Sequence, residues 1–491
     1  MEPCDLTIHA AHDLLRTRQL SSVELTRSVL ARIHRLDPQL QAYLTLAEES
    51  ALQQAAQVDA RIQSGESITP LTGIPFSAKD SIITQGVRTT CASRILENYI
   101  PPYQSAAIQR LLEAGAVLVG KNNMDEFGMG SSCENSAYFP TRNPWDTERV
   151  PGGSSGGSAT AVATGMALFA LGEDTGGSIR MPASFCGIVG LKPTYGRVSR
   201  YGLVALASSF DTIGPMTRDV QDAALVLEAI AGPDPRDSTS LRVAAPAYTQ
   251  NLGKDVRGLR LGVPKEYFVE GMQPGVADAI QQAIKIYQEL GVEIREVSLP
   301  NARFGLPVYY LILFAEASAN LARFDGIRFG RSERVAGGDV VDQFLRTRQA
   351  GFGPEVKRRI MLGAFTLSAG YYDAYYLKAQ KGRALIRGDF EAAFTQVDAL
   401  IAPTCPTTAF KLGEKVDDPL EMYLSDVYVV GANPAGVPAL ALACGLADGL
   451  PVGMQLIGNF LSEETLFQLG HAYQQRTDWH QQRPAILTEA A

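Results

Sequence analysis

Short apolar runs alternate with helical stretches and with glycine- and serine-rich turns over residues 71–218, and this alternation constrains the fold more than any other feature. A run such as Ala-Val-Leu-Val-Gly at residues 116–120 is typical of a strand in a sheet core. The pattern continues toward the carboxyl end, where a helical stretch at 276–290 lies among strand-like segments at 259–263, 292–297, 399–402 and 439–443. The sequence therefore predicts an α/β fold, with a mixed central β-sheet covered by helices on both faces.

The first 66 residues are predicted to be mainly helical. Ser21 and Glu24 have the spacing of a capping box, and apolar residues follow at helical period until Asp37-Pro38, where we expect the helix to stop. A second helix is predicted over about residues 43–62, before a glycine.

Turn-forming residues at 232–258 predict a long surface connection. It joins a core at about 67–232 to a second half at about 259–485, without requiring two domains. The 491 residues, of which 46% are apolar, suffice for a large core, and no internal repeat is found. A single domain over residues 1–491 is the simplest account. The six cysteines form no C-x-x-C pair, so we expect buried free thiols.

Charge and apolar patterning exclude some classes of function. A net charge of −8 argues against direct binding of nucleic acid by this chain. The amino terminus lacks the basic start and apolar run of a secretory signal. The most continuous apolar stretch considered, residues 159–171, is too short to span a bilayer. These features predict a cytoplasmic protein that does not enter a membrane.

Two segments stand out: Pro-Gly-Gly-Ser-Ser-Gly-Gly-Ser at 151–158 and Asp-Thr-Gly-Gly-Ser-Ile-Arg at 174–180. Such composition is usual in flexible linkers, but each segment lies between apolar structured stretches and should be an ordered turn. Glycines there would let backbone N–H groups approach a ligand closely. A phosphate-binding loop is excluded, because neither segment supplies the lysine of that motif.

A serine nucleophile is the remaining interpretation, and its base could be histidine or lysine. Residues 153–157 fit G-x-S-x-G with Ser155 as nucleophile, but only His471 and His480 follow, in a polar stretch. A neutral lysine can also activate serine. Lys79 ends a short apolar run that we expect to be a core strand, where lysine is rare; an ion pair with Asp80 is the structural alternative.

Taken together, Lys79 and the two glycine-serine segments closely resemble the amidase signature family, whose enzymes have one large domain and use a lysine, a serine preceded by a cis peptide bond, and a serine nucleophile. The resemblance implies that Lys79 is the general base, Ser154 the bridging serine and Ser178 the nucleophile. It further implies an oxyanion hole made by the N–H groups of Thr175, Gly176, Gly177 and Ser178. Asp174 and Arg180 are expected to brace this loop as an ion pair.

Within the family, residues 121–130, 196–204, 355–363 and 368–373 are similar to the glutaminase subunits of tRNA-dependent amidotransferases. That similarity implies that Arg358 holds the substrate carboxylate and Asp426 its ammonium group. It also implies that Tyr309 contacts the substrate, although the assignment could be shifted by one residue, to the adjoining Tyr310. The acyl pocket is expected to be lined by Met129, Gly130 and Ser131. Without the resemblance, Arg358 would lie on a solvated helix face and Asp426 would cap a helix.

The resemblance implies that the chain hydrolyses glutamine and supplies ammonia for the amidation of Glu-tRNA(Gln), Asp-tRNA(Asn) or both. It implies two partners: a B subunit, which binds tRNA and uses ATP and Mg²⁺, and a small C subunit, which lies at the interface. No cofactor and no metal is expected on this chain. A free-standing amidase acting on a small or aryl amide is the alternative, and an inactive scaffold is a third hypothesis, which the presence of Lys79, Ser154 and Ser178 disfavours.

Overall fold

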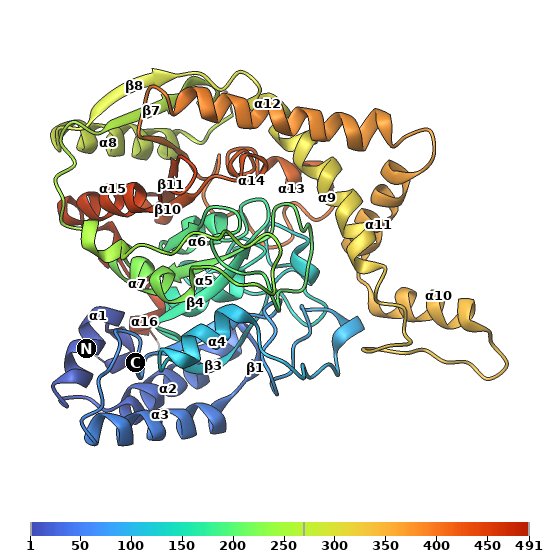
Figure 1. The fold of residues 1–491 in the computed structure, drawn as a ribbon, viewed down its shortest axis with the longest axis horizontal. Helices are drawn as coiled ribbons and strands as arrows, with labels where there is room; N and C mark the ends of the chain where they lie inside the picture. Colours follow the sequence, from blue (N-terminus) through green and yellow to red (C-terminus); the bar gives the residue numbers. More distant parts are fainter. Residues whose placement is uncertain (1, 269–270, 490–491) are drawn as a thin grey trace.

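A single mixed sheet of eleven strands forms the centre of the protein (Figure 1). The computed structural model describes residues 2–268 and 271–489. Across the sheet the strands lie in the order β1 (Tyr43–Leu46), β3 (Val117–Asn122), β2 (Pro75–Lys79), β4 (Phe169–Asp174), β6 (Thr212–Thr217), β5 (Val189–Lys192), β10 (Ala439–Ala447), β11 (Leu450–Gly458), β9 (Ala399–Pro403), β7 (Arg260–Pro264) and β8 (Glu293–Val297).

Strand direction changes across the sheet. β3, β2 and β4 run parallel to one another, as do β9, β7 and β8. The strands between these two groups pair antiparallel, and β10 and β11 form a hairpin. The predicted mixed sheet is confirmed, and the parallel pair β2 and β4 matters most for the site.

Helices cover both faces of the sheet, as predicted. Side chains alternate between faces along a strand, and in β10 Ala441 packs with α5 (Gly156–Ala163) and α6 (Arg180–Cys186). Its neighbours Leu440 and Leu442 belong to the core on the opposite face, together with α7 (Val220–Ile230) and α15 (Glu463–Arg476). Buried residues therefore line both faces of the same strand.

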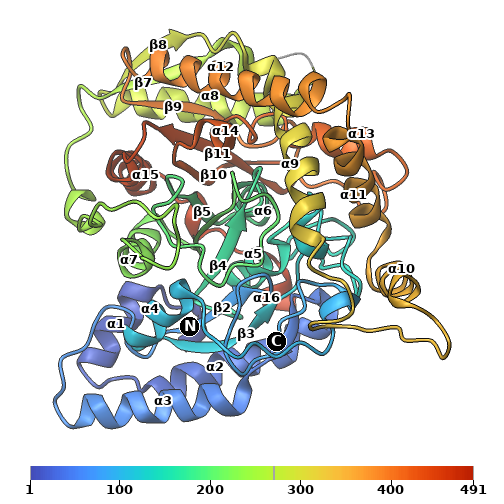
Figure 2. The same ribbon diagram turned by 45° about the vertical axis from the view of Figure 1, so that its right-hand side comes forward.

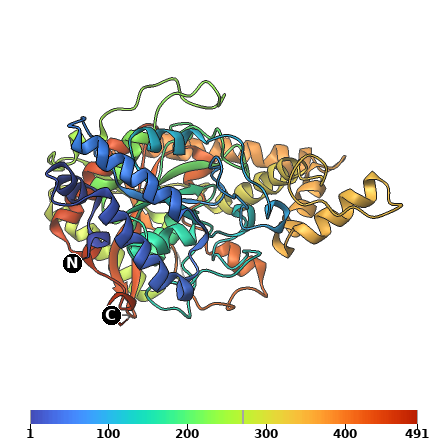
Figure 3. The same cartoon turned by 90° about the horizontal axis from the view of Figure 1, so that it is seen from below.

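The amino-terminal helices are α1 (Ile8–Arg16), α2 (Ser22–Leu40), α3 (Glu48–Gln63) and α4 (Ala106–Glu113), with α2 and α3 prominent in Figure 3. The Ser21–Glu24 capping box is confirmed. The stop at Asp37-Pro38 is wrong: α2 continues past Pro38 to Leu40 and is capped by Gln41, whose backbone takes the left-handed conformation common after a helix. The start of the second helix is also wrong, because residues 43–46 form β1 against β3.

The carboxyl half supplies α8 (Pro274–Glu289), α9 (Gly305–Leu321), α10 (Val340–Gly351), α11 (Pro354–Leu367), α12 (Lys378–Ala393), α13 (Pro419–Leu424), α14 (Ala432–Ala435) and α16 (Ile486–Glu489). Figures 1 and 3 show α10 projecting from the body of the molecule. One described helical stretch, Ala302–Leu321, is long and apolar enough to cross a membrane, and it differs from the stretch 159–171 considered from the sequence. Its buried side chains pack in the protein core with residues of α11 and α12.

The predicted surface connection at 232–258 contains only the 3-10 helix η4 (Tyr248–Asn251) within this fully described stretch. Tyr248 anchors it: the side chain is buried, and its hydroxyl accepts a hydrogen bond of 2.6 Å from Arg197 Nε. The six cysteines are buried free thiols, as predicted.

Candidate active site

The carboxyl ends of β2 and β4 bring the lysine and the two glycine-serine segments together. These strands are parallel neighbours, so their chains leave the sheet at the same edge (Figure 2). Lys79 is the last residue of β2, and Asp174 is the last residue of β4. The segment 151–158 runs into α5 and the segment 174–180 runs into α6, and both are buried throughout. Both are ordered parts of the core, as the sequence predicted.

Lys79 is fully buried and contacts the predicted bridging serine. Its Nζ lies 2.7 Å from Ser154 Oγ and 3.2 Å from the carbonyl oxygen of Glu173. The same Nζ lies 3.4 Å from Glu173 Oε2. The alternative ion pair of Lys79 with Asp80 is wrong: Lys79 ends β2, whereas Asp80 begins the following turn and pairs with Lys121 at 3.3 Å.

The loop around Ser154 is built so closely that one position admits only glycine. The Gly153-Ser154 peptide bond is cis, as the resemblance implied. A Cβ atom on Gly153 would lie 2.1 Å from Asp125 Oδ2 and 2.6 Å from the backbone nitrogen of Ser132. Asp125 itself accepts hydrogen bonds from the backbone of Cys133 and Asn135, at 2.9 and 3.0 Å. This neighbouring loop therefore fixes the path of the chain into Ser154.

The side chain and the backbone N–H of Ser155 are both used in hydrogen bonds within the protein. Its Oγ donates to the carbonyl of Glu173 at 3.1 Å, and its backbone N–H donates to the carbonyl of Ser178 at 3.1 Å. These bonds join the two glycine-serine loops. His471 and His480 line a different cavity, together with His9. The interpretation of Ser155 as a histidine-activated nucleophile is therefore not supported by their placement.

Ser178 is the most accessible member of the predicted catalytic set. Its exposed fraction is 8%, against 1% for Ser154 and 0% for Lys79. Of these three side chains, Ser178 is therefore the one that a molecule entering from solvent can reach most easily. This order suits a nucleophile served by a buried proton relay.

Asp174 and Arg180 brace the loop that carries Ser178. The carboxylate accepts hydrogen bonds from Arg180 Nε and Nη2, both at 3.1 Å, and from Asn433 at 2.8 Å. Burial alone would raise the pKa of Asp174, but the charge and hydrogen bonds of Arg180 outweigh it and hold that pKa well below its usual range. The predicted ion pair is confirmed.

The same carboxylate uses one donor of the predicted oxyanion hole. The N–H of Gly177 donates to Asp174 Oδ1 at 2.9 Å. Within the described chain, the N–H groups of Gly176 and Ser178 donate no hydrogen bond to another residue. Tyr309 of α9 covers this turn, since a Cβ atom on Gly176 would lie 2.2 Å from Tyr309 Cζ. The structure thus places Tyr309 directly against the loop that carries Ser178.

Asp426 is buried beside two hydroxyl groups. Its Oδ2 accepts hydrogen bonds from Tyr310 at 2.7 Å and from Ser131 at 3.0 Å. Burial raises the pKa of Asp426 to about 7. The structure therefore brings Asp426 and Ser131 together, and it places the adjoining Tyr310, with Tyr309, at the same site.

Arg358 and Arg359 both line a cavity of about 60 Å³, together with Gly130 and Tyr423. Arg358 is 43% exposed and pairs with Glu355. Arg359 is buried, donates to Glu355 Oε1 at 2.7 Å, and lies 5.5 Å from the ring centre of Tyr310 and 5.2 Å from that of Tyr423. Met129, in contrast, is buried within an apolar cluster.

Several residues around the site were not singled out from sequence: Glu173, Glu355, Arg359 and Tyr423. Glu173 had one available signal, since it is an acidic residue near the end of the otherwise apolar run Phe-Ala-Leu-Gly. The others depend on how α9, α11 and α13 pack around the cavity, which no local pattern reports.

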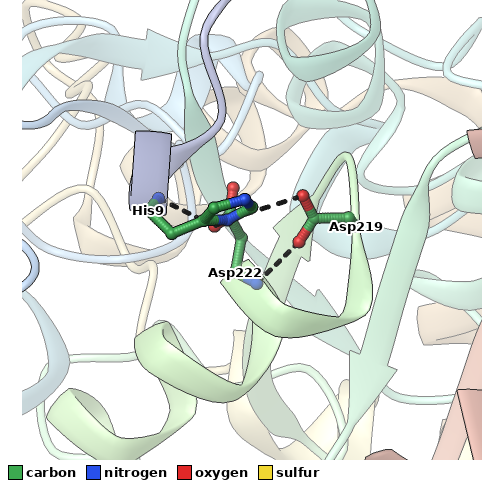
Figure 4. Close-up of side chains that lie close together, drawn as sticks. All are labelled: His9, Asp219 and Asp222. Carbon is green, nitrogen blue, oxygen red and sulfur yellow. Dashed lines mark hydrogen bonds and ion pairs between the residues drawn. The ribbon is translucent and has the colours of Figure 1, made fainter. Parts of the chain in front are cut away.

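A second titratable cluster lies between α1 and α7 (Figure 4). His9, Asp219 and Asp222 each place a potential metal-ligand atom within 4.8 Å of the others. However, Asp222 accepts hydrogen bonds from the backbone of Ile8 at 2.7 Å and His9 at 3.2 Å, and Asp219 caps α7. The hydrogen bond with Asp222 raises the pKa of His9. We assign this cluster to the joint between α1 and α7.

Comparisons with known proteins agree with this geometry. The family model described as Amidase matches residues 24–467. The chain is 58% identical to the A subunit of the glutamyl-tRNA(Gln) amidotransferase of Moorella thermoacetica over 486 residues, which is 99% of each chain. It is 42% identical to the solved A subunit of the glutamyl-tRNA(Gln) amidotransferase of Thermotoga maritima, with a TM-score of 0.80 over 97% of this chain and 96% of that one. It is 32% identical to the native peptide amidase of Stenotrophomonas maltophilia, with a TM-score of 0.82 over 98% of each chain.

Proposed function

The chain belongs to the amidase family, and from this membership we propose that it is the glutamine-hydrolysing subunit of a glutamyl-tRNA(Gln) amidotransferase. The observation that carries the proposal is the contact of 2.7 Å between Lys79 Nζ and Ser154 Oγ, at the edge of the sheet where the Ser178 loop also begins. Full-length similarity to the A subunits of such enzymes supports the choice of glutamine as substrate.

The reaction proceeds through an acyl-enzyme. Ser178 Oγ attacks the side-chain carbonyl of glutamine while its proton passes to Ser154 Oγ, and the Ser154 proton passes to neutral Lys79. The proton returns by the same path to the departing nitrogen, and ammonia leaves. Water then attacks the γ-glutamyl ester and releases glutamate. These steps use only side chains of this protein and water.

The negative charge on the carbonyl oxygen is stabilised by the backbone of the Ser178 loop. We assign this role to the N–H groups of Thr175, Gly176 and Ser178, each such donor being worth about 3 kcal/mol in the transition state. Gly177 was predicted as a further donor, and its N–H serves mainly to hold the loop against Asp174.

Asp426 binds the α-ammonium group of glutamine, supported by Tyr310 and Ser131. The α-carboxylate is attached to the same carbon, so its partner must lie near Asp426. Arg359 meets this condition better than Arg358, because its guanidinium lies 5.5 Å from the ring centre of Tyr310, the residue whose hydroxyl donates a hydrogen bond to Asp426. We therefore propose that Arg359 binds the carboxylate and that Arg358 lies at the outer edge of the cavity.

The ammonia is consumed by another chain. The relatives are named as subunits, which supports a multi-subunit enzyme. We propose a cytoplasmic complex in which the B subunit holds misacylated tRNA, activates its carboxyl group with ATP and Mg²⁺, and receives ammonia, while the small C subunit lies at the interface. The net charge of −8 agrees with tRNA binding on the partner.

The test is to measure glutamine hydrolysis and tRNA amidation with and without the co-expressed partner subunits. The proposal predicts glutamine-dependent amidation that requires Ser178. A free-standing amidase is the second candidate, favoured by the similarity to a peptide amidase over nearly the whole chain. Full activity on simple amides without partners, unaffected by replacement of Asp426 or Arg359, would establish that candidate instead.

A further inference from the structure

Glu173 touches the catalytic lysine with both its backbone and its side chain. The residue is 1% exposed and precedes Asp174 at the end of β4. Its carbonyl oxygen lies 3.2 Å from Lys79 Nζ, and its Oε2 lies 3.4 Å from the same atom. Ser81 donates a hydrogen bond of 2.7 Å to Oε2 and holds the carboxylate in place. The mechanism described above gives this carboxylate no role.

Lys79 Nζ has three oxygen neighbours, and a neutral amine has three sites that can face them: two N–H groups and a lone pair. Two contacts go to Glu173, and the third, of 2.7 Å, goes to Ser154 Oγ. If one N–H group donates to the Glu173 carbonyl and the other lies toward the nearby carboxylate, the lone pair is directed at Ser154, which is the orientation a base requires.

We propose that Glu173 is a positioning residue for catalysis, which directs the Lys79 lone pair at Ser154 and neutralises the lysine when it takes up the proton. The inference rests on the proposed roles of Lys79, Ser154 and Ser178. During acylation, the bond between Ser178 Oγ and the carbonyl carbon forms, one proton moves to Ser154, and the Ser154 proton moves to Nζ. In the resulting ammonium one N–H group faces Ser154, ready to return the proton to the leaving nitrogen, while the Glu173 carbonyl accepts a hydrogen bond and the Glu173 carboxylate lies at ion-pair distance.

Among the acidic groups around Lys79, Glu173 is the one placed to act as the counter-ion of the protonated amine. Burial and the nearby Glu173 charge raise the pKa of Asp211 to about 8, so Asp211 is mainly protonated at neutral pH. Burial also raises the pKa of Asp125, whose charge interacts with Lys79. On the other side of β2, Asp80 is paired with Lys121. Cys91 faces the same group of charges, and burial raises its thiol pKa well above the usual range.

The test compares Glu173→Gln and Glu173→Asp in the complex purified with its partner subunits, using glutamine as substrate and glutamate release as readout. Gln keeps the size of the side chain and removes the charge. We expect kcat to fall by about 10- to 100-fold with little change in KM. We also expect the acid limb of the kcat profile, which reports the complex with glutamine already bound at Asp426, to move to lower pH by about one unit, because the protonated amine loses its counter-ion. Asp keeps the charge, so its acid limb should stay in place while kcat falls.

Glu463→Gln is the matched control, because Glu463 is equally buried and also has one carboxylate oxygen without a hydrogen-bond partner, but it contacts the backbone of Thr194. It should leave the pH profile unchanged. A loss of activity in Glu173→Gln with an unmoved acid limb would show a merely structural role and overturn the inference, as would unchanged kinetics. Lys79→Ala separates the two proposals: if that variant stays active, the proposed function itself fails, whatever Glu173 does.

Discussion

Tyr310 donates a hydrogen bond of 2.7 Å to Asp426 Oδ2 inside the protein, next to the cavity lined by Arg359. The bond stabilises the ionised carboxylate, whereas burial, the larger influence, raises its pKa to about 7. The pair therefore places a carboxylate that titrates near neutral pH where the substrate ammonium group is proposed to bind.

This titration predicts a pH-dependent affinity for glutamine. Only ionised Asp426 attracts the ammonium group, so below about pH 7 the KM should rise by about tenfold per pH unit. Tyr310→Phe removes a hydrogen bond that lowers the pKa, so the rise in KM should begin at higher pH. Tyr309→Phe is the control and should leave this limb in place. Steady-state kinetics from pH 5 to pH 8 measure the effect, and a KM independent of pH would contradict it.

The two arginines that line the cavity, Arg358 and Arg359, should differ in how much they contribute to glutamine binding. Arg359→Lys keeps the charge but loses the planar donor pair, and Arg359→Ala loses both, so the KM for glutamine should rise by about 10- to 100-fold in the alanine variant. Arg358→Ala should raise KM by less than about fivefold, since its exposed guanidinium pairs with Glu355 in high dielectric. Glutaminase kinetics decide between them. The reverse order of effects would assign the carboxylate to Arg358.

The Asp174–Arg180 pair predicts a large effect on stability. Asp174→Ala leaves the buried Arg180 without its counter-ion and should lower the free energy of unfolding by about 3–5 kcal/mol. Because the folded-state pKa of Asp174 lies below its unfolded value, the stabilisation is present above about pH 4 and is lost as pH falls through the folded-state pKa. Urea denaturation at several pH values measures it. The exposed Asp417→Asn is the control, and equal stability of both variants would contradict the assignment.

Replacing Gly176 should impair catalysis, because Tyr309 leaves no room for a larger side chain at this position. Alanine at this position places a Cβ atom 2.2 Å from Tyr309 Cζ, so the nucleophile loop or the tyrosine must move. We expect Gly176→Ala to lower kcat/KM by about 100-fold or more, as loss of an oxyanion donor does. The double variant with Tyr309→Ala should recover part of it. Gly388→Ala, in open space on α12, should stay fully active and be slightly more stable. An active Gly176→Ala variant would contradict the proposed oxyanion hole.

The sequence indicated candidates for the lysine and the serines more readily than it indicated the residues around the neighbouring cavity. Lys79 could be found because a lysine at the end of an apolar run is unusual, and the resemblance distinguished Ser154 from Ser155, which spacing alone could not do. The sequence left open whether Tyr309 or Tyr310 makes the contact. Neighbouring residues on a helix point in different directions, and only the packed structure shows which hydroxyl reaches Asp426. The strand at 43–46 was missed because its pairing with β3 comes from residues far away in sequence.

Glu173 illustrates the same limit. Its position beside Lys79 follows from the parallel alignment of β2 and β4, and the two residues are 94 positions apart. The local sequence shows only that an acidic residue occurs in a predicted buried strand. Its partner becomes evident once the sheet order is known.

The central claim is that glutamine acylates Ser178, and trapping the acyl-enzyme tests it most directly. The complex is mixed with glutamine, quenched in acid within milliseconds, digested, and analysed by mass spectrometry. We predict a γ-glutamyl adduct on the peptide that contains Ser178, retained in Ser155→Ala and absent in Ser178→Ala and Lys79→Ala. An adduct that persists in Ser178→Ala, or glutamine hydrolysis at full rate in that variant, would contradict the account.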